Sequence, residues 1–272
     1  MTAPIAIGGV GGSGTRLVAR LVAALGVDTG EDLNPAHDNL WYTLLFKHAD
    51  VATLAPEAFA ARARIFVATM TGARALDPDE VSLLCALAAE THPQHDREWL
   101  QDRALSMFMA AAAPRPRPPR WGWKEPNTHV ALPQWRRVLP RLRYIHVVRN
   151  GLDMAFSSNL NQLDLWGPWL LERAVERTPR DALAYWCAAH RRVTGIGATM
   201  AADFLALDYD RLCRDPDNGL AELAAFLGVP APDAQALAGF VEVPKTIGRG
   251  LDAPREQFDP GDLAYLEAIG HL

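Results

Sequence analysis

Hydrophobic residues along the chain occur in two patterns: short continuous runs and longer segments with helical spacing. The apolar run at 3–9 predicts a strand. The segment 14–25 has apolar residues three and four positions apart, which predicts a helix that ends at Gly26. Three further apolar runs predict strands at 120–124, 144–148 and 204–208. The chain therefore opens with a strand, a loop and a helix, and returns to strands later.

The segments between these strands predict helices. Helical spacing is found at 38–48, 56–70, 78–90, 95–112, 128–139, 151–162, 180–200 and 216–227, followed by two shorter helical segments. Strands that alternate with helices indicate a three-layer α/β fold, in which helices cover both faces of a central parallel sheet. In such folds ligands bind at the carboxyl ends of the strands.

The length of the chain sets the expected number of domains. With 272 residues, 49% of them hydrophobic, the chain can bury a large core. The proline-rich segment 114–120 cannot continue a helix, and we expect it to be an exposed loop rather than a domain boundary. We therefore expect one domain over residues 1–272.

The loop after the first strand has the composition of an anion site. Its sequence from Gly8 to Arg16 is Gly-Gly-Val-Gly-Gly-Ser-Gly-Thr-Arg. Glycines allow backbone amides to turn toward a bound oxyanion, and the first turn of the next helix adds unpaired amides. A nucleoside triphosphatase loop would instead end in Gly-Lys-Ser/Thr, whose Lys and hydroxyl serve the phosphates and Mg²⁺. We expect a phosphate or sulfate group at this loop.

Two other strand ends carry cationic residues. Arg149 follows the strand at 144–148, and Ser157 lies eight residues later, about two turns into the expected helix. An Arg fork and a Ser hydroxyl could both contact one phosphate. Lys124 ends another strand, in Trp-Gly-Trp-Lys-Glu-Pro. The ordinary alternatives are a structural salt bridge for Arg149 and a surface position for Lys124.

Composition narrows the function classes. The formal net charge of −5 argues against nucleic-acid binding. Cys85, Cys187 and Cys213 lack zinc-site or disulfide spacing, so we expect reduced, buried thiols. The first strand leaves no room for a signal peptide, and no apolar run reaches the roughly 18 residues of a membrane span, which predicts a cytoplasmic protein without a membrane partner.

Three parts of the sequence are the glycine loop, the pair Arg149 and Ser157, and the segment around Lys124. Together they resemble the sulfotransferases that use 3′-phosphoadenosine-5′-phosphosulfate (PAPS), with some motifs similar to the tyrosylprotein branch. The family's phosphosulfate loop contains Ser-Gly-Thr after the first strand, as in Ser13-Gly14-Thr15. Its 3′-phosphate site is an Arg at a strand end with a Ser eight residues later, as for Arg149 and Ser157. The resemblance extends from residue 5 to about 228, and it implies a P-loop-type fold.

The resemblance implies roles for particular residues. The residues expected to bind PAPS or its product PAP are Gly11, Gly12, Ser13, Gly14, Thr15, Arg16, Arg149, Ser157, Tyr209 and Arg249. Among these, Tyr209 would lie near the adenine, and Arg249 belongs to a basic loop that closes over the cofactor in some members. The chain departs from the family in lacking a cation before Ser13, and Arg16 could supply that charge.

The resemblance also implies the catalytic groups. Lys124 would stabilise charge on the transferring group, as the Lys of Lys-Asp-Pro does in the tyrosylprotein branch. That branch has its base in a Gly-Glu segment, which is matched by Gly30-Glu31. Glu31 is our first choice of base and Asp32 the second, with His37 as a further candidate. Acidic loop residues are usually solvated, so this loop could equally lack the base.

The expected reaction is transfer of a sulfuryl group to a hydroxyl, or an amine, of a small-molecule acceptor. Positioning and charge stabilisation dominate such transfers, and no metal is required. The helical stretch at 38–113 would shape the acceptor pocket. Two alternatives remain: a P-loop nucleotide kinase or GTPase, and a non-catalytic protein that binds PAP or another nucleotide. The acceptor's identity and the oligomeric state are left open by the sequence.

Overall fold

The computed structural model describes residues 3–113, 118–230, 237 and 239–272. Its four strands are β1 (Ile5–Gly9), β2 (Gly122–Lys124), β3 (Arg143–Val148) and β4 (Phe204–Asp208). They form a parallel sheet in the order β2-β1-β3-β4. In the β3–β4 register, Tyr144 lies opposite Phe204 and Val148 opposite Asp208. The predicted α/β fold with helices flanking a parallel sheet is confirmed.

The described residues group into two compact units. Unit 1 comprises residues 1–6, 26–125 and 131–143, and unit 2 comprises residues 7–25, 126–130 and 144–272. The single domain expected over residues 1–272 remains a prediction. None of the described helices is both long and apolar enough to cross a lipid bilayer.

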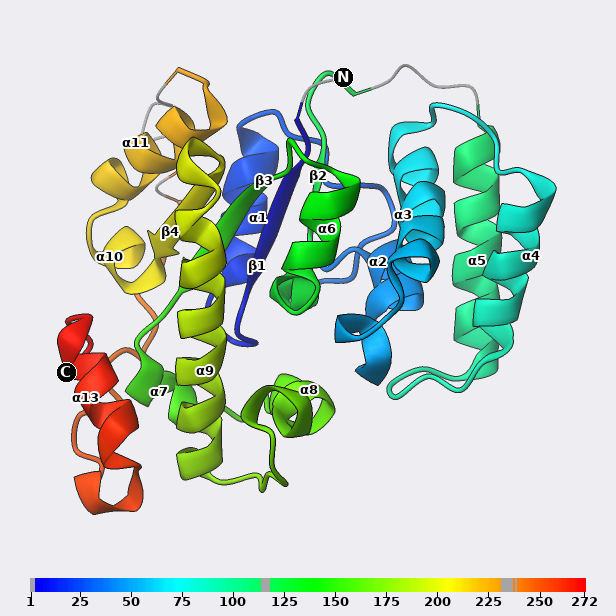
Figure 1. Cartoon of the computed structure of the whole chain (residues 1–272). Coiled ribbons are helices and arrows are strands. Elements are labelled where there is room, and N and C mark those ends of the chain that lie inside the picture. The colour runs from blue at the N-terminus through cyan, green and yellow to red at the C-terminus, as the bar shows by residue number, and fades with distance from the viewer. Residues whose placement is uncertain (1–2, 114–117, 231–236, 238) are drawn as a thin grey trace. The chain divides into compact units, whose positions relative to one another are not determined.

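Unit 1 is mainly helical. Its helices are α2 (Leu40–Phe46), α3 (Pro56–Thr71), α4 (Pro78–Ala89), α5 (Arg97–Ala112) and α6 (Leu132–Val138). Helices α3, α4 and α5 lie side by side (Figure 1). The core is aromatic: Tyr42 packs against Phe66, Trp123 and Trp135. Asp77 and Glu80 form a capping box that fixes the start of α4.

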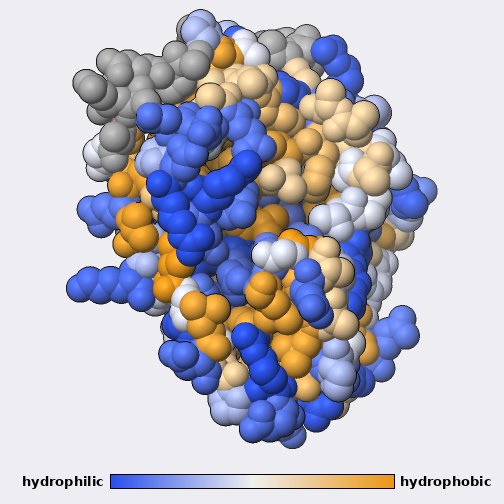
Figure 2. Space-filling view, turned by 90° about the vertical axis from the view of Figure 1, so that its left-hand side faces the viewer, coloured by the Kyte–Doolittle hydropathy of each residue, from blue (hydrophilic) through white to orange (hydrophobic). Residues whose placement is uncertain are grey.

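Unit 2 holds the other helices. They are α1 (Thr15–Ala24), α7 (Gly151–Ala155), α8 (Asn161–Leu171), α9 (Pro179–Ala198), α10 (Tyr209–Arg214), α11 (Pro216–Leu227) and α13 (Pro260–Ala268). The long α9 packs against α7, α8 and α13, and α10 and α11 pack on β4 (Figure 1). On the face of the molecule drawn in Figure 2, hydrophilic residues gather around a central hollow.

One predicted helix is wrong. The chain from 151 to 162 is not continuous helix, because α7 ends at Ala155 and α8 begins at Asn161. Between them the side chains of Ser157 and Asn159 accept hydrogen bonds from the amides of Asn159 and Asn161. Such local side-chain bonds compete with helix formation. Ser157 therefore lies in a turn after α7 rather than two turns inside a helix.

The three cysteines are free, as expected, but not all are buried. Cys187 and Cys213 are buried, whereas Cys85 is exposed on α4. The prediction of a buried thiol is wrong for Cys85, because this residue lies in a shallow apolar groove at the surface formed by α4 and α5.

Candidate functional site

The glycine loop turns tightly from β1 into α1. Gly14 caps α1 in the left-handed region with φ of 95°, and Gly12 also has a positive φ of 96°. A Cβ on Gly14 would lie only 2.1 Å from the ring of Tyr209, and one on Gly12 would lie 3.1 Å from Ser157 Oγ. Glycine is therefore required at both positions for backbone conformation and for close approach.

The loop presents unused hydrogen-bond donors. Within the described part of the chain, no protein acceptor takes up the amides of Gly12, Gly14, Thr15 or Arg16. Ser13 is 1% exposed, and its Oγ has no hydrogen-bond partner among the described residues. Buried polar groups are normally paired, so an orphan hydroxyl beside several unused amides indicates a place for an anion.

Two residues distant in sequence lie against this loop. The Arg149 guanidinium donates from Nη1 to the carbonyl oxygen of Gly12 at 3.4 Å. The same guanidinium lies over the Tyr209 ring, 5.6 Å from its centroid. Arg149, Tyr209 and Ser157 are thus brought together with the glycine loop, all within unit 2.

The Arg149 side chain is buried and held on two further sides. Its Nη2 donates to Thr246 Oγ1 at 2.6 Å, and its Nε lies 3.7 Å from Asp210 Oδ1 without a hydrogen bond. Burial raises the pKa of Asp210, although that carboxylate also accepts a bond from the Asn150 amide. The result is a cation fixed in position, in which the described residues engage two of the five N–H groups, and this suits recognition of a phosphate.

Asp153 ties a distant segment to α7. Its carboxylate accepts hydrogen bonds from the amides of Gly248 and Gly250 at 2.7 and 2.9 Å. Arg249 Nε donates to the Asp153 backbone oxygen at 2.6 Å. Burial, together with the nearby Arg149, lowers the pKa of Arg249. The basic segment is thereby held beside the element that follows Arg149.

In unit 1, Lys124 is buried at the end of β2 and forms an ion pair with Asp38. Its Nζ also donates to the carbonyl oxygen of Ala36 at 3.1 Å. Asn34 supports this turn, because its Oδ1 accepts from the Asp38 amide at 2.9 Å and its Nδ2 donates to Asp38 Oδ2 at 2.8 Å. Lys124 is thus no free surface residue.

The three candidate bases have different surroundings. Asp32 accepts from Arg103 Nη1 at 2.8 Å and from Ser106 Oγ at 3.1 Å. Glu31 is exposed, whereas His37 is half-buried with a positive φ of 61°. Asp38, which the sequence interpretation did not consider, is the carboxylate that contacts Lys124.

Comparison with known proteins identifies the family. A family model described as "Sulfotransferase family" matches residues 4–233. The chain belongs to the sulfotransferase family. Sulfuryl transfer is therefore the general reaction of this enzyme, and the resemblance drawn from its motifs is confirmed.

Solved structures also resemble this sulfotransferase. A sulfotransferase domain from the curacin biosynthetic pathway is 12% identical with a TM-score of 0.54, and the match covers 99% of this chain and 98% of that one. The domain from the Synechococcus PCC 7002 olefin synthase is 19% identical with a TM-score of 0.46, over 97% and 82% of the two chains. Sulfotransferase STF1 from Mycobacterium tuberculosis H37Rv is 15% identical with a TM-score of 0.41, over 88% and 71%. A search of curated proteins found no match.

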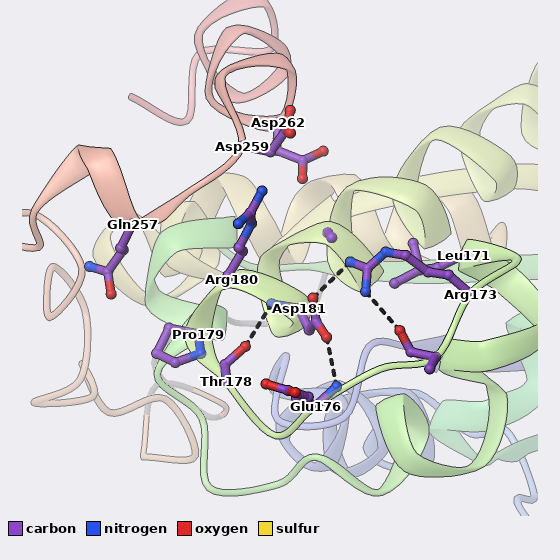
Figure 3. Close-up of a pocket in the computed structure, with 12 residues that line it drawn as sticks. Leu171, Arg173, Glu176, Thr178, Pro179, Arg180, Asp181, Gln257, Asp259 and Asp262 are labelled. Carbon is purple, nitrogen blue, oxygen red and sulfur yellow. Dashed lines mark hydrogen bonds and ion pairs between the residues drawn. The ribbon is translucent and has the colours of Figure 1, made fainter.

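One pocket of the sulfotransferase lies apart from the predicted site residues. A pocket of about 740 Å³ lies at the start of α9, and none of its lining residues is a predicted site residue (Figure 3). Some of its polar groups contact one another: Arg173 forms an ion pair with Asp181 at 2.7 Å, and the Glu176 amide donates to the same carboxylate at 2.6 Å. The hydrogen bond from Arg173 lowers the pKa of Asp181. One internal ion pair, between Arg173 and Asp181, thus holds part of the lining of this pocket.

Several residues of the sulfotransferase site carried no sequence signal of their own. Thr246, Asp153 and Asp210 act on Arg149 or on its neighbouring segments, but only the tertiary structure brings them together. Asp210 could have been noticed, because it directly follows Tyr209 at the end of β4. The described residues contain no group of three or more His, Cys, Asp or Glu arranged to hold a metal ion.

Proposed function

We propose that this sulfotransferase uses PAPS as its sulfuryl donor and transfers the group to a hydroxyl, or an amine, of a small-molecule acceptor. One observation carries the proposal: the buried Arg149 guanidinium lies against Gly12, in the loop where the Ser13 hydroxyl has no partner. Two anion-binding groups side by side suit a nucleotide with phosphates on both its 3′ and 5′ sides.

The remaining contacts fit parts of such a donor. The unused amides of the loop and Ser13 Oγ would receive the 5′-phosphosulfate, and Arg149 with Ser157 would receive the 3′-phosphate. The half-buried Tyr209 ring, packed on Gly14, offers a flat surface for the adenine. Arg249, held by Asp153, would add positive charge near the 3′ side.

The chemistry requires charge stabilisation and a proton acceptor. As the bond between sulfur and the phosphate oxygen breaks, negative charge grows on that oxygen, where loop amides and Lys124 would stabilise it. A new bond forms between sulfur and the acceptor oxygen, whose proton passes to a base, for which Glu31 is our first choice and Asp32 the second. PAP then leaves.

The test compares two nucleotides that differ in one phosphate. A ligand that binds only the folded state stabilises it, by about 2.7 kcal/mol at a hundredfold excess over Kd. PAP should therefore raise the melting temperature clearly, without added metal, and AMP should raise it little. Arg149→Ala should abolish this difference, whereas Arg211→Ala, which removes an exposed arginine of unit 2, should preserve it.

Other results would contradict the proposal. If PAP and AMP raised the melting temperature equally, Arg149 would have no role in recognising a 3′-phosphate. Turnover of ATP or GTP that depends on Mg²⁺ would favour a nucleotide kinase or GTPase, and binding of PAPS without transfer to any acceptor would favour a non-catalytic binding protein.

A further inference from the structure

A buried glutamine lies under the glycine loop. Gln162 is the second residue of α8 and is 5% exposed. Its side-chain Nε2 donates to the carbonyl oxygen of Gly9 at 3.2 Å, and its Oε1 accepts from the amide of Gly11 at 3.2 Å. One side-chain amide thus bonds to both ends of the three-residue segment centred on Val10.

Two more contacts complete the hydrogen bonding of the Gln162 side-chain amide. Nε2 also donates to Asn127 Oδ1 at 2.8 Å, and Oε1 lies 3.2 Å from His129 Nε2. The amide therefore uses two donor and two acceptor positions, which is its full capacity. A buried polar group this completely satisfied has a single favourable orientation.

The backbone decides that orientation. A carbonyl oxygen can only accept and an amide N–H can only donate, so Gly9 must face Nε2 and Gly11 must face Oε1. His129 must then donate from its Nε2. Burial lowers the pKa of His129 to about 4, so the ring is neutral near pH 7 and carries one proton, placed on Nε2 by this contact.

The partners of Gln162 are themselves held. Asn127 and His129 lie in a short 3₁₀ turn, η2 (Pro126–His129). Arg192 of α9 donates to the carbonyl oxygens of His129 and Val130 at 2.8 and 3.0 Å. A continuous set of hydrogen bonds within unit 2 thus runs from α9 through η2 and Gln162 to the glycine loop.

This arrangement has a consequence for the loop amides. The Gly11 amide is satisfied by Gln162, and the Ser13 amide donates to the carbonyl oxygen of Val10 at 3.0 Å. The loop backbone before α1 is thereby fixed. The amides of Gly12, Gly14, Thr15 and Arg16 then remain for a ligand.

We propose that Gln162 is a positioning residue, which holds the glycine loop in the conformation that receives the anionic end of the sulfuryl donor. Gln162 acts through the backbone of Gly9 and Gly11 and does not itself contact the donor. The inference rests on the proposed function for the identity of the ligand, but the ordering of the loop can be measured without any ligand.

The experiment uses two variants and a matched control in the full-length protein. Gln162→Met keeps the length of the side chain and removes its hydrogen bonds, and Gln162→Glu keeps the shape but removes both donors. Gln134→Met is the control, because Gln134 is also buried and donates to Leu54 at 3.0 Å but belongs to unit 1. Hydrogen exchange of the Gly11 amide, PAP affinity, melting temperature and kcat at saturating PAPS are measured for each.

We expect a specific loss in the Gln162 variants. The Gly11 amide should exchange at least about tenfold faster, and the PAP Kd should rise about tenfold, since hydrogen bonds to the loop are lost. The kcat at saturating PAPS should fall much less, because no reacting group is touched. Gln134→Met should leave Gly11 exchange and PAP Kd unchanged, even where its melting temperature falls as far as that of Gln162→Met.

The outcomes separate the two proposals. Unchanged Gly11 exchange in both Gln162 variants, or faster exchange with an unchanged PAP Kd, overturns the positioning role. A wild-type protein that fails to bind PAP contradicts the proposed function instead, while Gly11 exchange in the free protein still decides whether Gln162 orders the loop. His129→Leu, which removes one donor to Oε1 and leaves the Gly9 and Gly11 contacts, should give a smaller effect of the same sign.

Discussion

At the scale of single residues, residues 31–38 of the loop after α1 contain four groups able to accept a proton. Asp32 is held by Arg103 and Ser106, and Asp38 is paired with Lys124. Glu31 is exposed and His37 half-buried. Arg103 and Ser106 engage both carboxylate oxygens of Asp32, so this residue is held in a structural contact. Glu31 therefore stays our first choice of base and Asp32 the second.

The prediction for the base is a selective loss of turnover. Glu31→Gln keeps the size of the side chain and removes its basicity, so kcat should fall by about 10² to 10⁴ with PAP Kd unchanged. Asp32→Asn and His37→Gln should retain most of the activity. Steady-state kinetics with a good acceptor, together with PAP titrations, measure both quantities.

A different pattern among these variants would reassign the base. If Asp38→Asn alone lowered kcat while Glu31→Gln did not, the carboxylate paired with Lys124 would be the stronger candidate. Near wild-type kcat in all four variants would show that the base lies outside residues 31–38.

The sequence could predict the site residues at strand ends, but it could not predict the side chains that hold these residues in position. Lys124 ends a strand and Arg149 directly follows one, so their positions in the parallel sheet indicated their importance, whereas the family resemblance pointed to Tyr209. Thr246 lies 97 positions from Arg149 and Gln162 lies 151 from Gly11. No periodicity or motif relates residues so far apart, so only the folded chain could show these contacts.

At the scale of secondary-structure elements, the interruption between α7 and α8 matters most. Helical spacing predicted one helix over 151–162, because apolar residues continue on one face through Phe156. The Ser and Asn side chains in the turn outweigh that pattern. The break lets Ser157 reach Gly12 and starts a new helix whose second residue is Gln162.

The contact of α7 with the segment 246–250 gives a second prediction. Asp153→Asn keeps one acceptor oxygen and places an NH₂ group against one of the two glycine amides. Hydrogen bonds to charged groups are worth about 1.5–3 kcal/mol, so the segment should loosen and PAP affinity should fall about tenfold, because Thr246 would no longer be held beside Arg149. Hydrogen exchange at Gly248 and Gly250 and calorimetric titration with PAP measure the two effects.

A matched substitution controls for the loss of an acidic group. Asp164→Asn removes an exposed carboxylate of α8 that pairs with Arg177 at 3.4 Å, and it should change neither quantity. Unchanged exchange at Gly248 and Gly250 in Asp153→Asn would show that the segment is held by other contacts.

At the scale of the whole molecule, the proposed roles divide between the two units. The residues proposed to bind PAPS lie in unit 2, whereas Lys124 and the candidate bases lie in unit 1. Substitutions should divide in the same way: changes in unit 2 should mainly alter affinity for PAP, and changes in unit 1 should mainly alter turnover. The family and the α/β fold could be predicted from the loop and the strand pattern, but this division could not, because unit 1 is assembled from three separate stretches of sequence.

Lys124 provides the test of this division between turnover and PAP affinity. A group that acts mainly in the transition state lowers kcat when removed and leaves ground-state affinity nearly intact. Lys124→Met should therefore reduce kcat by about 10² to 10³, by analogy with the loss of an oxyanion donor, while PAP binds almost normally. Kinetics at saturating PAPS and a PAP titration test the two parts separately.

The ion pair with Asp38 complicates this substitution, because removing one partner leaves a carboxylate with little solvent and no cation. The double variant Lys124→Met/Asp38→Asn removes that charge and should recover stability without recovering kcat. Lys47→Met, which changes another lysine of unit 1, should keep full activity. If the double variant turned over at the wild-type rate, the loss in Lys124→Met would reflect an unpaired Asp38, and charge stabilisation would have to come from the loop amides and Arg16.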